Sequence, residues 1–123
     1  MTAETLLLRQ VHPNFVQNGF ASSVAFRPNE SDNGLMSVYD CDLITAEDAW
    51  VHFTSVLLKK SAGVTALSVG ECMAESLPPR PDTQPFPEHA VVDFTKVDEK
   101  LWRSKSKKLQ AKALPRGWCH VAG

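Results

Sequence analysis

Polar side chains that could bind an anion or move a proton occur near the ends of three predicted strands. An arginine and a histidine belong to the first strand, a serine and a second arginine to the next, and a histidine opens a later one. In a small sheet these side chains could line a common cleft, where two guanidinium groups would hold a carboxylate or phosphate through paired hydrogen bonds. We therefore predict a binding site for a small anionic ligand, made of Arg9, His12, Ser23, Arg27 and His89.

The last quarter of the chain offers a second surface for an anionic partner. Residues 1–95 contain five basic and twelve acidic side chains, whereas residues 96–123 contain eight basic and two acidic ones. Opposite charges within one small domain attract each other, so this segment could simply pack on the acidic body of the molecule. Alternatively its cations could contact an acidic protein or the phosphates of a nucleic acid. The residues predicted for that contact are Lys100, Arg103, Lys107 and Lys108.

Hydrophobic periodicity predicts the elements that must hold these side chains. Alternating, β-branched stretches indicate strands, and a 3.6-residue period with capping residues indicates helices. The strands are expected over residues 6–12, 22–26, 35–39, 64–69 and 89–94, and the helices over residues 45–60 and 95–114. The first three strands are joined by connections too short for a crossover, which predicts an antiparallel meander. The predicted fold class is α+β: a mostly antiparallel sheet of about five strands with two helices on one face, in a single domain.

The composition is that of an ordinary folded protein. Of the 123 residues, 43% are hydrophobic and 22% are charged, and the net charge is −1. A collagen-like chain and a wholly disordered chain are therefore excluded. No apolar stretch approaches the ~18 residues of a membrane span, and the acidic start of the chain does not resemble a signal peptide. Three widely spaced cysteines favour free thiols in a reducing compartment, so we expect a cytoplasmic protein without membrane contact.

The sequence contains no motif for a metal, a cofactor or a catalytic centre. Its histidines and cysteines show neither C-x-x-C nor H-x-x-x-H spacing, so we predict no metal site and no cofactor. No G-x-S-x-G motif exposes a serine nucleophile. Residues from which a triad could be chosen are present, as in most chains of this length: Ser22, Ser23, Ser37, His12, His89 and Asp93. On this basis we predict no catalytic residue.

Three stretches carry a resemblance to other proteins. Residues 9–13 (Arg-Gln-Val-His-Pro), 37–40 (Ser-Val-Tyr-Asp) and 87–94 (Pro-Glu-His-Ala-Val-Val-Asp-Phe) resemble small bacterial proteins of unassigned function. The resemblance covers most of the chain and implies a stand-alone bacterial domain, with no implied activity. Arg9 and His12, followed by serines, also resemble the first elements of ADP-ribosyltransferase folds, but the Glu-x-Glu element of that pattern is missing.

Together these features favour a non-catalytic binding or interaction module. It would contact an anionic partner through the basic C-terminal helix or through the strand-end cleft. One alternative is a small enzyme acting on an anionic or nucleotide-like substrate in a cleft lined by Arg9, His12, Ser23 and His89. Another alternative is a structural homo-oligomer, such as a homodimer, that buries Val51, Leu58 and a sheet edge.

Overall fold

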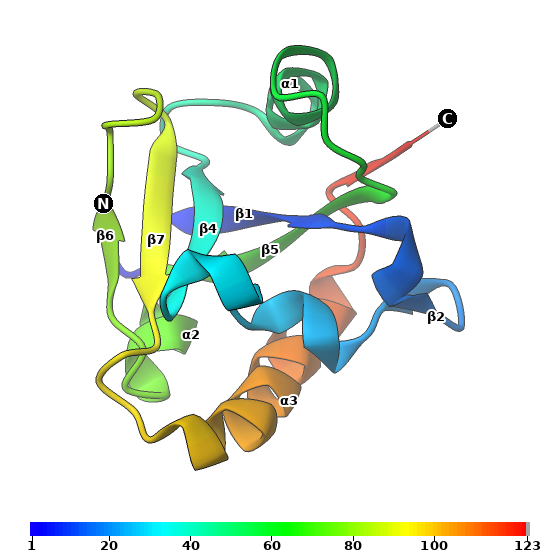
Figure 1. Cartoon of the computed structure of the whole chain (residues 1–123). Coiled ribbons are helices and arrows are strands. Elements are labelled where there is room, and N and C mark those ends of the chain that lie inside the picture. The colour runs from blue at the N-terminus through cyan, green and yellow to red at the C-terminus, as the bar shows by residue number, and fades with distance from the viewer. Residues whose placement is uncertain (123) are drawn as a thin grey trace.

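A six-stranded antiparallel sheet organises residues 1–122, the residues that the computed structural model describes (Figure 1). The strand order is β6-β7-β4-β1-β5-β8. The strands are β1 (Leu6–Val11), β4 (Leu35–Asp40), β5 (Gly63–Ser68), β6 (Pro79–Pro81), β7 (His89–Asp93) and β8 (His120–Val121). A small hairpin joins β2 (Val16–Gln17) to β3 (Phe20–Ala21). The predicted fold class, α+β with a mostly antiparallel sheet, is confirmed.

The two predicted helices, which the structure forms as α1 (Ala46–Val51) and α3 (Trp102–Ala113), lie on opposite faces of this sheet and not on one face as expected. A further helix is α2 (Val69–Ala74). Leu7 and Leu8 are neighbours in β1, so their side chains point to opposite faces. Leu7 belongs to the buried cluster that includes Leu109 of α3, and Leu8 belongs to the cluster that includes Ala49 of α1. Figure 1 shows α1 and α3 on either side of the sheet, which explains why β1 is buried along almost its whole length.

Helix α1 continues into a π-helical turn. Thr45 caps the first turn of the helix, as predicted, by accepting a hydrogen bond from the backbone N–H of Asp48. The α-helical pattern gives way to a π-helix at His52–Val56. Leu58, just beyond it, has a left-handed backbone with φ of 56°. The helix therefore ends earlier than the predicted residue 60, and its last turn is distorted in a way often found at functional sites.

Helix α3 begins later than its predicted start. The expected cap, Thr95, instead donates hydrogen bonds from its N–H and its hydroxyl to the carboxylate of Asp93. Asp98 caps a 3-10 turn over Glu99–Leu101, and α3 follows from Trp102. The predicted helix is thus confirmed in its central and C-terminal parts, with a different cap.

Two other expectations are wrong. Ser23–Phe26 forms a 3-10 helix whose last two residues are buried, and this segment packs against α3 instead of joining the sheet. The first three predicted strands therefore do not form a meander, since β1 lies between β4 and β5. Strand β5 ends at Ser68, which forms a capping box with Glu71, so Val69 begins α2 and is not a strand residue.

Candidate functional site

Strands β1 and β4 form a fork. In the part of the chain that the structure describes, β1 pairs with β5 along its whole length, but its pairing with β4 ends at Leu8–Tyr39. Beyond this pair the two strands separate. Backbone groups that would have been paired in a continuous ladder need other partners there. The side chain of Arg9 occupies part of the gap, and a pocket opens beside it.

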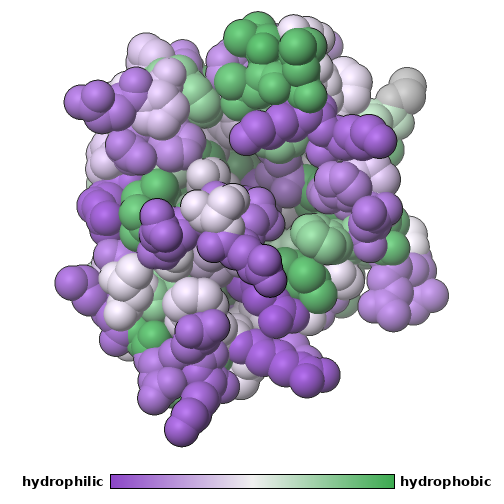
Figure 2. All heavy atoms as spheres, in the orientation of Figure 1, coloured by the Kyte–Doolittle hydropathy of each residue, from purple (hydrophilic) through white to green (hydrophobic). Residues whose placement is uncertain are grey.

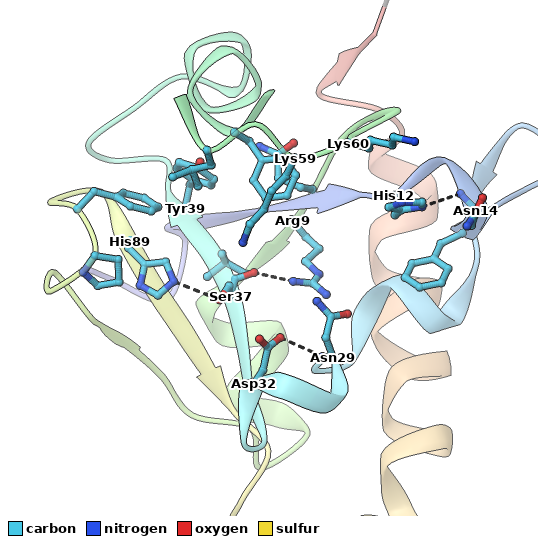
Figure 3. Close-up of a pocket in the computed structure, with 17 residues that line it drawn as sticks. Arg9, His12, Asn14, Asn29, Asp32, Ser37, Tyr39, Lys59, Lys60 and His89 are labelled. Atoms are coloured by element: carbon cyan, nitrogen blue, oxygen red, sulfur yellow. Dashed lines mark hydrogen bonds between the residues drawn. The ribbon is translucent and has the colours of Figure 1, made fainter. Parts of the chain in front are cut away.

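This pocket has a volume of about 780 Å³ (Figure 3). The volume lies within the range of sites that bind small molecules. Its walls come from β1, β4 and β7, from the 3-10 turns after β1 and before β4, from the π-helical turn with the loop after it, and from the loop before β7. Arg9 and Gln10 both line it, although successive strand residues point to opposite faces. The pocket therefore reaches into the opening of the fork.

Arg9 provides a fixed positive charge in the pocket wall. Its Nε donates to the carbonyl oxygen of Ala25 at 2.7 Å, its Nη1 to that of Ser37 at 2.8 Å, and its Nη2 to that of Arg27 at 3.2 Å. Burial lowers the pKa of the Arg9 guanidinium to about 10, and the carboxylate of Asp32 opposes that shift. The group is still a cation at neutral pH. Because three carbonyls hold the guanidinium in place, Arg9 supplies a fixed positive charge and cannot close on a ligand.

Positive side chains outnumber negative ones around the pocket. Lys59 and Lys60 are exposed and follow the π-helical turn. Figure 3 shows the Lys59 side chain extending across the pocket, and its Nζ lies 5.8 Å from the ring centroid of Phe53. Among the lining residues that the structure describes, Asp32 is the acidic one, against three cations with Arg9 included. The pocket is therefore electropositive in a chain whose net charge is negative.

An aromatic wall faces these cations. The ring of Phe86 packs against Tyr39 at 5.1 Å, His52 at 4.6 Å and His89 at 5.1 Å between centroids. A hydrogen bond of 2.7 Å joins the Tyr39 hydroxyl to Nδ1 of His52. Burial raises the pKa of Tyr39 far above its ordinary value, with a further contribution from Glu88, so its hydroxyl stays neutral. The rings of Tyr39 and Phe86 thus give the pocket an uncharged aromatic surface that suits a flat apolar body.

His89 links this wall to a serine on β4. Its Nδ1 lies 2.8 Å from the backbone oxygen of Asp82 and 3.5 Å from the Oδ2 of the same residue, and its Nε2 lies 3.2 Å from Oγ of Ser37. His89 is buried, whereas Ser37 is exposed and lines the pocket. Figure 3 shows the imidazole of His89 pointing toward Ser37. The pair is thus a hydrogen-bonded serine and histidine at the edge of a pocket.

Gln10 is the unusual buried group of the site. It is 9% exposed and lines the pocket, yet neither Nε2 nor Oε1 has a hydrogen-bond partner among residues 1–122. Both atoms are themselves buried, so they lie behind the pocket surface. An unpartnered buried amide is costly, on the order of 1–3 kcal/mol.

Of the five predicted cleft residues, the structure brings Arg9, His12 and His89 together in the pocket lining. Ser23 lies in the 3-10 helix and is not a lining residue. Arg27 lines a second, smaller pocket of about 370 Å³. The expected pair of guanidinium groups around one anion is therefore not formed.

Sequence reasoning missed several lining residues. Lys59, Lys60 and Phe86 line the pocket but were not among the predicted cleft residues. Phe53, which falls within the helix predicted over residues 45–60, also lines the pocket. The dilysine placed directly after a helix was the one local signal that could have been used.

The basic C-terminal segment is only partly paired within residues 1–122. Lys108 lies 3.7 Å from the Oε1 of Glu75, so one predicted contact residue packs on the acidic body. Lys100, Arg103 and Lys107 are exposed, and no carboxylate of these described residues lies within ion-pair distance. Part of the segment therefore packs on the acidic body, and the other predicted contact residues are open to solvent.

Exposed apolar side chains gather over α1 and the turn after it (Figure 2). Val51 is 44%, Val56 is 65% and Leu58 is 81% exposed. Val51 and Leu58 are the residues that the homo-oligomer hypothesis would bury, and in the single chain both are open to solvent.

Other chemistry finds little support in residues 1–122. They contain no group of three or more His, Cys, Asp and Glu side chains arranged to hold a metal ion. In the same residues, no helix combines the length and the apolar character that crossing a bilayer requires. The cysteines are free, and burial raises the pKa of the Cys72 thiol to about 12, so that thiol is not a reactive thiolate at neutral pH.

Comparisons with protein-family models, with curated proteins and with solved structures gave no match to this chain.

Proposed function

We propose that the protein binds a small anionic molecule with an aromatic or otherwise apolar body in the pocket between β1 and β4. The observation that carries the proposal is the charge of the lining: Arg9, Lys59 and Lys60 against Asp32, in a chain whose net charge is −1. A concave surface of one sign concentrates ligands of the opposite sign. The volume of about 780 Å³ suits a molecule of metabolite size.

The anionic group would be held at the exposed side of the pocket. Lys59 and Lys60 have long flexible stems and can close on a carboxylate or a phosphate. His12 can add a hydrogen bond to the same anion. Its Nδ1 accepts from the backbone N–H of Asn14 at 3.0 Å, so in the neutral ring the proton is on Nε2, which can donate.

The apolar body would lie against the aromatic wall. Phe53 and Phe86 both line the pocket, and aromatic rings offer large flat contact areas. The buried charge of Arg9 would act on the ligand from behind, without releasing the carbonyls that hold it. Because the lysines would bind the negative group and the aromatic rings the flat body, we expect a ligand to need both parts for full affinity.

Calorimetric titration with benzoate, salicylate and phenyl phosphate, and with benzamide as the uncharged probe, tests the proposal. We expect at least one anion to bind about tenfold more tightly than benzamide, and to bind more weakly as salt rises from ~50 to ~200 mM. The double variant Lys59→Ala/Lys60→Ala should weaken anion binding by about tenfold.

The matched control is Lys100→Ala/Lys107→Ala, which removes the same charge outside the pocket and should leave the affinity unchanged. The proposal fails if none of the anions binds. It also fails if benzamide binds as well as the anions, or if both double variants behave alike.

A second candidate function is supported by the exposed cations of the C-terminal segment. Lys100, Arg103 and Lys107 have no acidic partner among residues 1–122 and could contact an acidic protein or a nucleic acid. Trp102 is fixed in place and is not a mobile stacking group, because its Nε1 donates to two backbone carbonyls and its ring packs edge-on against Phe94. Such binding would therefore rest on charge, and fluorescence anisotropy with a labelled DNA 20-mer should show it lost in Lys100→Ala/Arg103→Ala/Lys107→Ala.

A further inference from the structure

The hydrogen bonds of His89 fix which of its nitrogens carries the proton. The backbone oxygen of Asp82, 2.8 Å from Nδ1, can only accept a hydrogen bond, so Nδ1 must donate. In the neutral ring Nε2 is then unprotonated and can only accept. The partner 3.2 Å away is Oγ of Ser37, whose hydroxyl therefore donates to Nε2. This is the arrangement that a serine nucleophile and its general base require.

The sheet holds the two residues in this relationship. Tyr39 of β4 lies opposite His89 of β7, and Ser37 lies opposite Val91. Ser37 and His89 are thus diagonal neighbours on adjacent strands, with side chains on the same face of the sheet. Phe86 packs against the imidazole and limits its rotation. A site built on paired strands in this way keeps its geometry better than one built on loops.

The surroundings match the charges that acyl transfer develops. The carboxylate of Asp82 lies 3.5 Å from Nδ1, where it would stabilise the imidazolium formed when His89 takes a proton. On the other side, the Lys59 side chain extends across the pocket that Ser37 lines (Figure 3). Its ammonium can approach the negative oxygen of a tetrahedral intermediate on Ser37. Ser37 is exposed, so a substrate can reach its hydroxyl.

We propose that Ser37 is the nucleophile and His89 the general base of an acyl-transfer site that hydrolyses small esters carrying an anionic group. The ester class rests on the proposed function, because the cations of the pocket select the anion. The role of Ser37 rests on its own contacts with His89.

The reaction balances with water as the one co-substrate. Oγ of Ser37 attacks the ester carbonyl carbon while its proton passes to Nε2 of His89. The carbon–oxygen bond to the alcohol then breaks, and the alcohol leaves with that proton. A water molecule then attacks the acyl-serine and gives one proton to Nε2. That proton passes from Nε2 to Oγ of Ser37 as the carboxylic acid is released. No oxidant, metal or cofactor is needed.

Diisopropyl fluorophosphate is the first probe, because it is small and neutral and does not depend on the anion-binding side chains. Ser37 should displace fluoride and form a phosphoserine ester, located by peptide mass spectrometry. Ser37→Ala should not be labelled, and Ser104→Ala, an exposed serine on α3, should be labelled like the original protein. His89→Asn, checked for folding by circular dichroism, should be labelled at least about 100-fold more slowly.

The second probe is the anionic ester 4-nitrophenyl hemisuccinate, compared with neutral 4-nitrophenyl acetate. We expect a higher kcat/KM for the anionic ester, reduced at least about 100-fold in Ser37→Ala. Asp82→Ala should lose about tenfold in kcat with little change in KM, because the backbone carbonyl that orients His89 remains.

The outcomes separate the two proposals. If Ser37 is not labelled, or if Ser37→Ala hydrolyses both esters as fast as the original protein, the acyl-transfer inference is overturned, and binding of benzoate or phenyl phosphate still decides the proposed function. If Ser37 is labelled but kcat/KM is no higher for the anionic ester than for the neutral one, Ser37 is still the nucleophile and the proposed class of ester is wrong.

Discussion

Nη1 of Arg9 donates a 2.8 Å hydrogen bond to the carbonyl oxygen of Ser37, across the gap where β1 and β4 separate. The side chain of one strand thus replaces a backbone partner that the other strand has lost. The same guanidinium holds the carbonyls of Ala25 and Arg27, which flank the end of the neighbouring 3-10 helix. One buried cation therefore supports the fork structurally and gives the pocket its fixed positive charge.

Removing this cation should destabilise the fold as well as the pocket. In Arg9→Met, three buried or half-buried carbonyls lose their donor, and we expect the free energy of unfolding to fall by about 3 kcal/mol. Urea denaturation measures this change. Arg103→Met, which removes an exposed guanidinium without an ion pair among residues 1–122, should stay within about 0.5 kcal/mol of the original protein. Equal stability of the two variants would show that Arg9 is not a structural link.

Removing the unpartnered buried polar groups should increase the free energy of unfolding. Gln10 and Thr65 are buried, and their side-chain polar atoms have no hydrogen-bond partner among residues 1–122. Gln10→Met and Thr65→Val keep the approximate shape and remove those atoms, so each should raise the free energy of unfolding by about 1 kcal/mol. Urea midpoints report the change.

The control for this pair is Gln110, whose Nε2 donates to the carbonyl of Ala21 at 2.9 Å. Gln110→Met should lower the stability by about 1 kcal/mol, because that carbonyl loses its donor. If Gln10→Met is destabilising to the same extent, the amide of Gln10 is satisfied in solution, for example by an internal water.

Local sequence signals were sufficient for much of the sheet. Alternation and β-branched residues located the strands that became β1, β4 and β7, and Thr45 marked the start of α1. They failed for the apolar run at Ser23–Phe26, because so short a run fits a strand or a helical turn equally well. The faces of the helices could not be predicted either, since the two-sided burial of β1 shows only once both helices are packed.

The pocket was less predictable than the fold. Arg9, His12 and His89 were predicted because their residue types bind anions and they fall near strand ends. The fork itself depends on where β4 stops pairing with β1, which is a tertiary property that local sequence does not encode. Lys59 follows a π-helical turn that the sequence pattern did not predict, and Ser37 meets His89 through the register of β4 and β7.

Stability should fall in acid because two carboxyl groups have lowered pKa values. Burial acts to raise the pKa of Asp93, but hydrogen bonds from Thr95 and Arg80 outweigh it. Burial likewise opposes the lowering at Glu71, where Arg116 and Ser68 supply the hydrogen bonds. A carboxyl whose pKa is lower in the folded state stabilises the fold above its unfolded pKa of about 4. That stabilisation is lost as the pH falls through this value toward the folded pKa.

We therefore expect the urea midpoint to change little between pH 7 and pH 5 and to decrease below about pH 4. Asp93→Asn and Glu71→Gln should be less stable at pH 7 and should lose less between pH 5 and pH 3 than the original protein. Glu47→Gln, on the exposed first turn of α1, is a suitable control. If the three variants show the same acid dependence, other groups cause the loss.

The left-handed backbone at Leu58 is a strained conformation that glycine would relieve. Its φ is 56°, and its side chain is 81% exposed, so packing of the leucine does not offset the strain. The conformation costs a residue with a Cβ about 1 kcal/mol, and glycine adopts it freely. Leu58→Gly should therefore raise the stability by about 0.5 kcal/mol after the extra entropy of the unfolded chain is subtracted.

Leu101→Gly, at a position with φ of −92° and 48% exposure, should instead lose about 1 kcal/mol. Thermal melts at two protein concentrations measure both changes. A destabilised Leu58→Gly with a concentration-dependent melting temperature would mean that Leu58 is buried between two copies of the chain, as the homo-oligomer hypothesis requires.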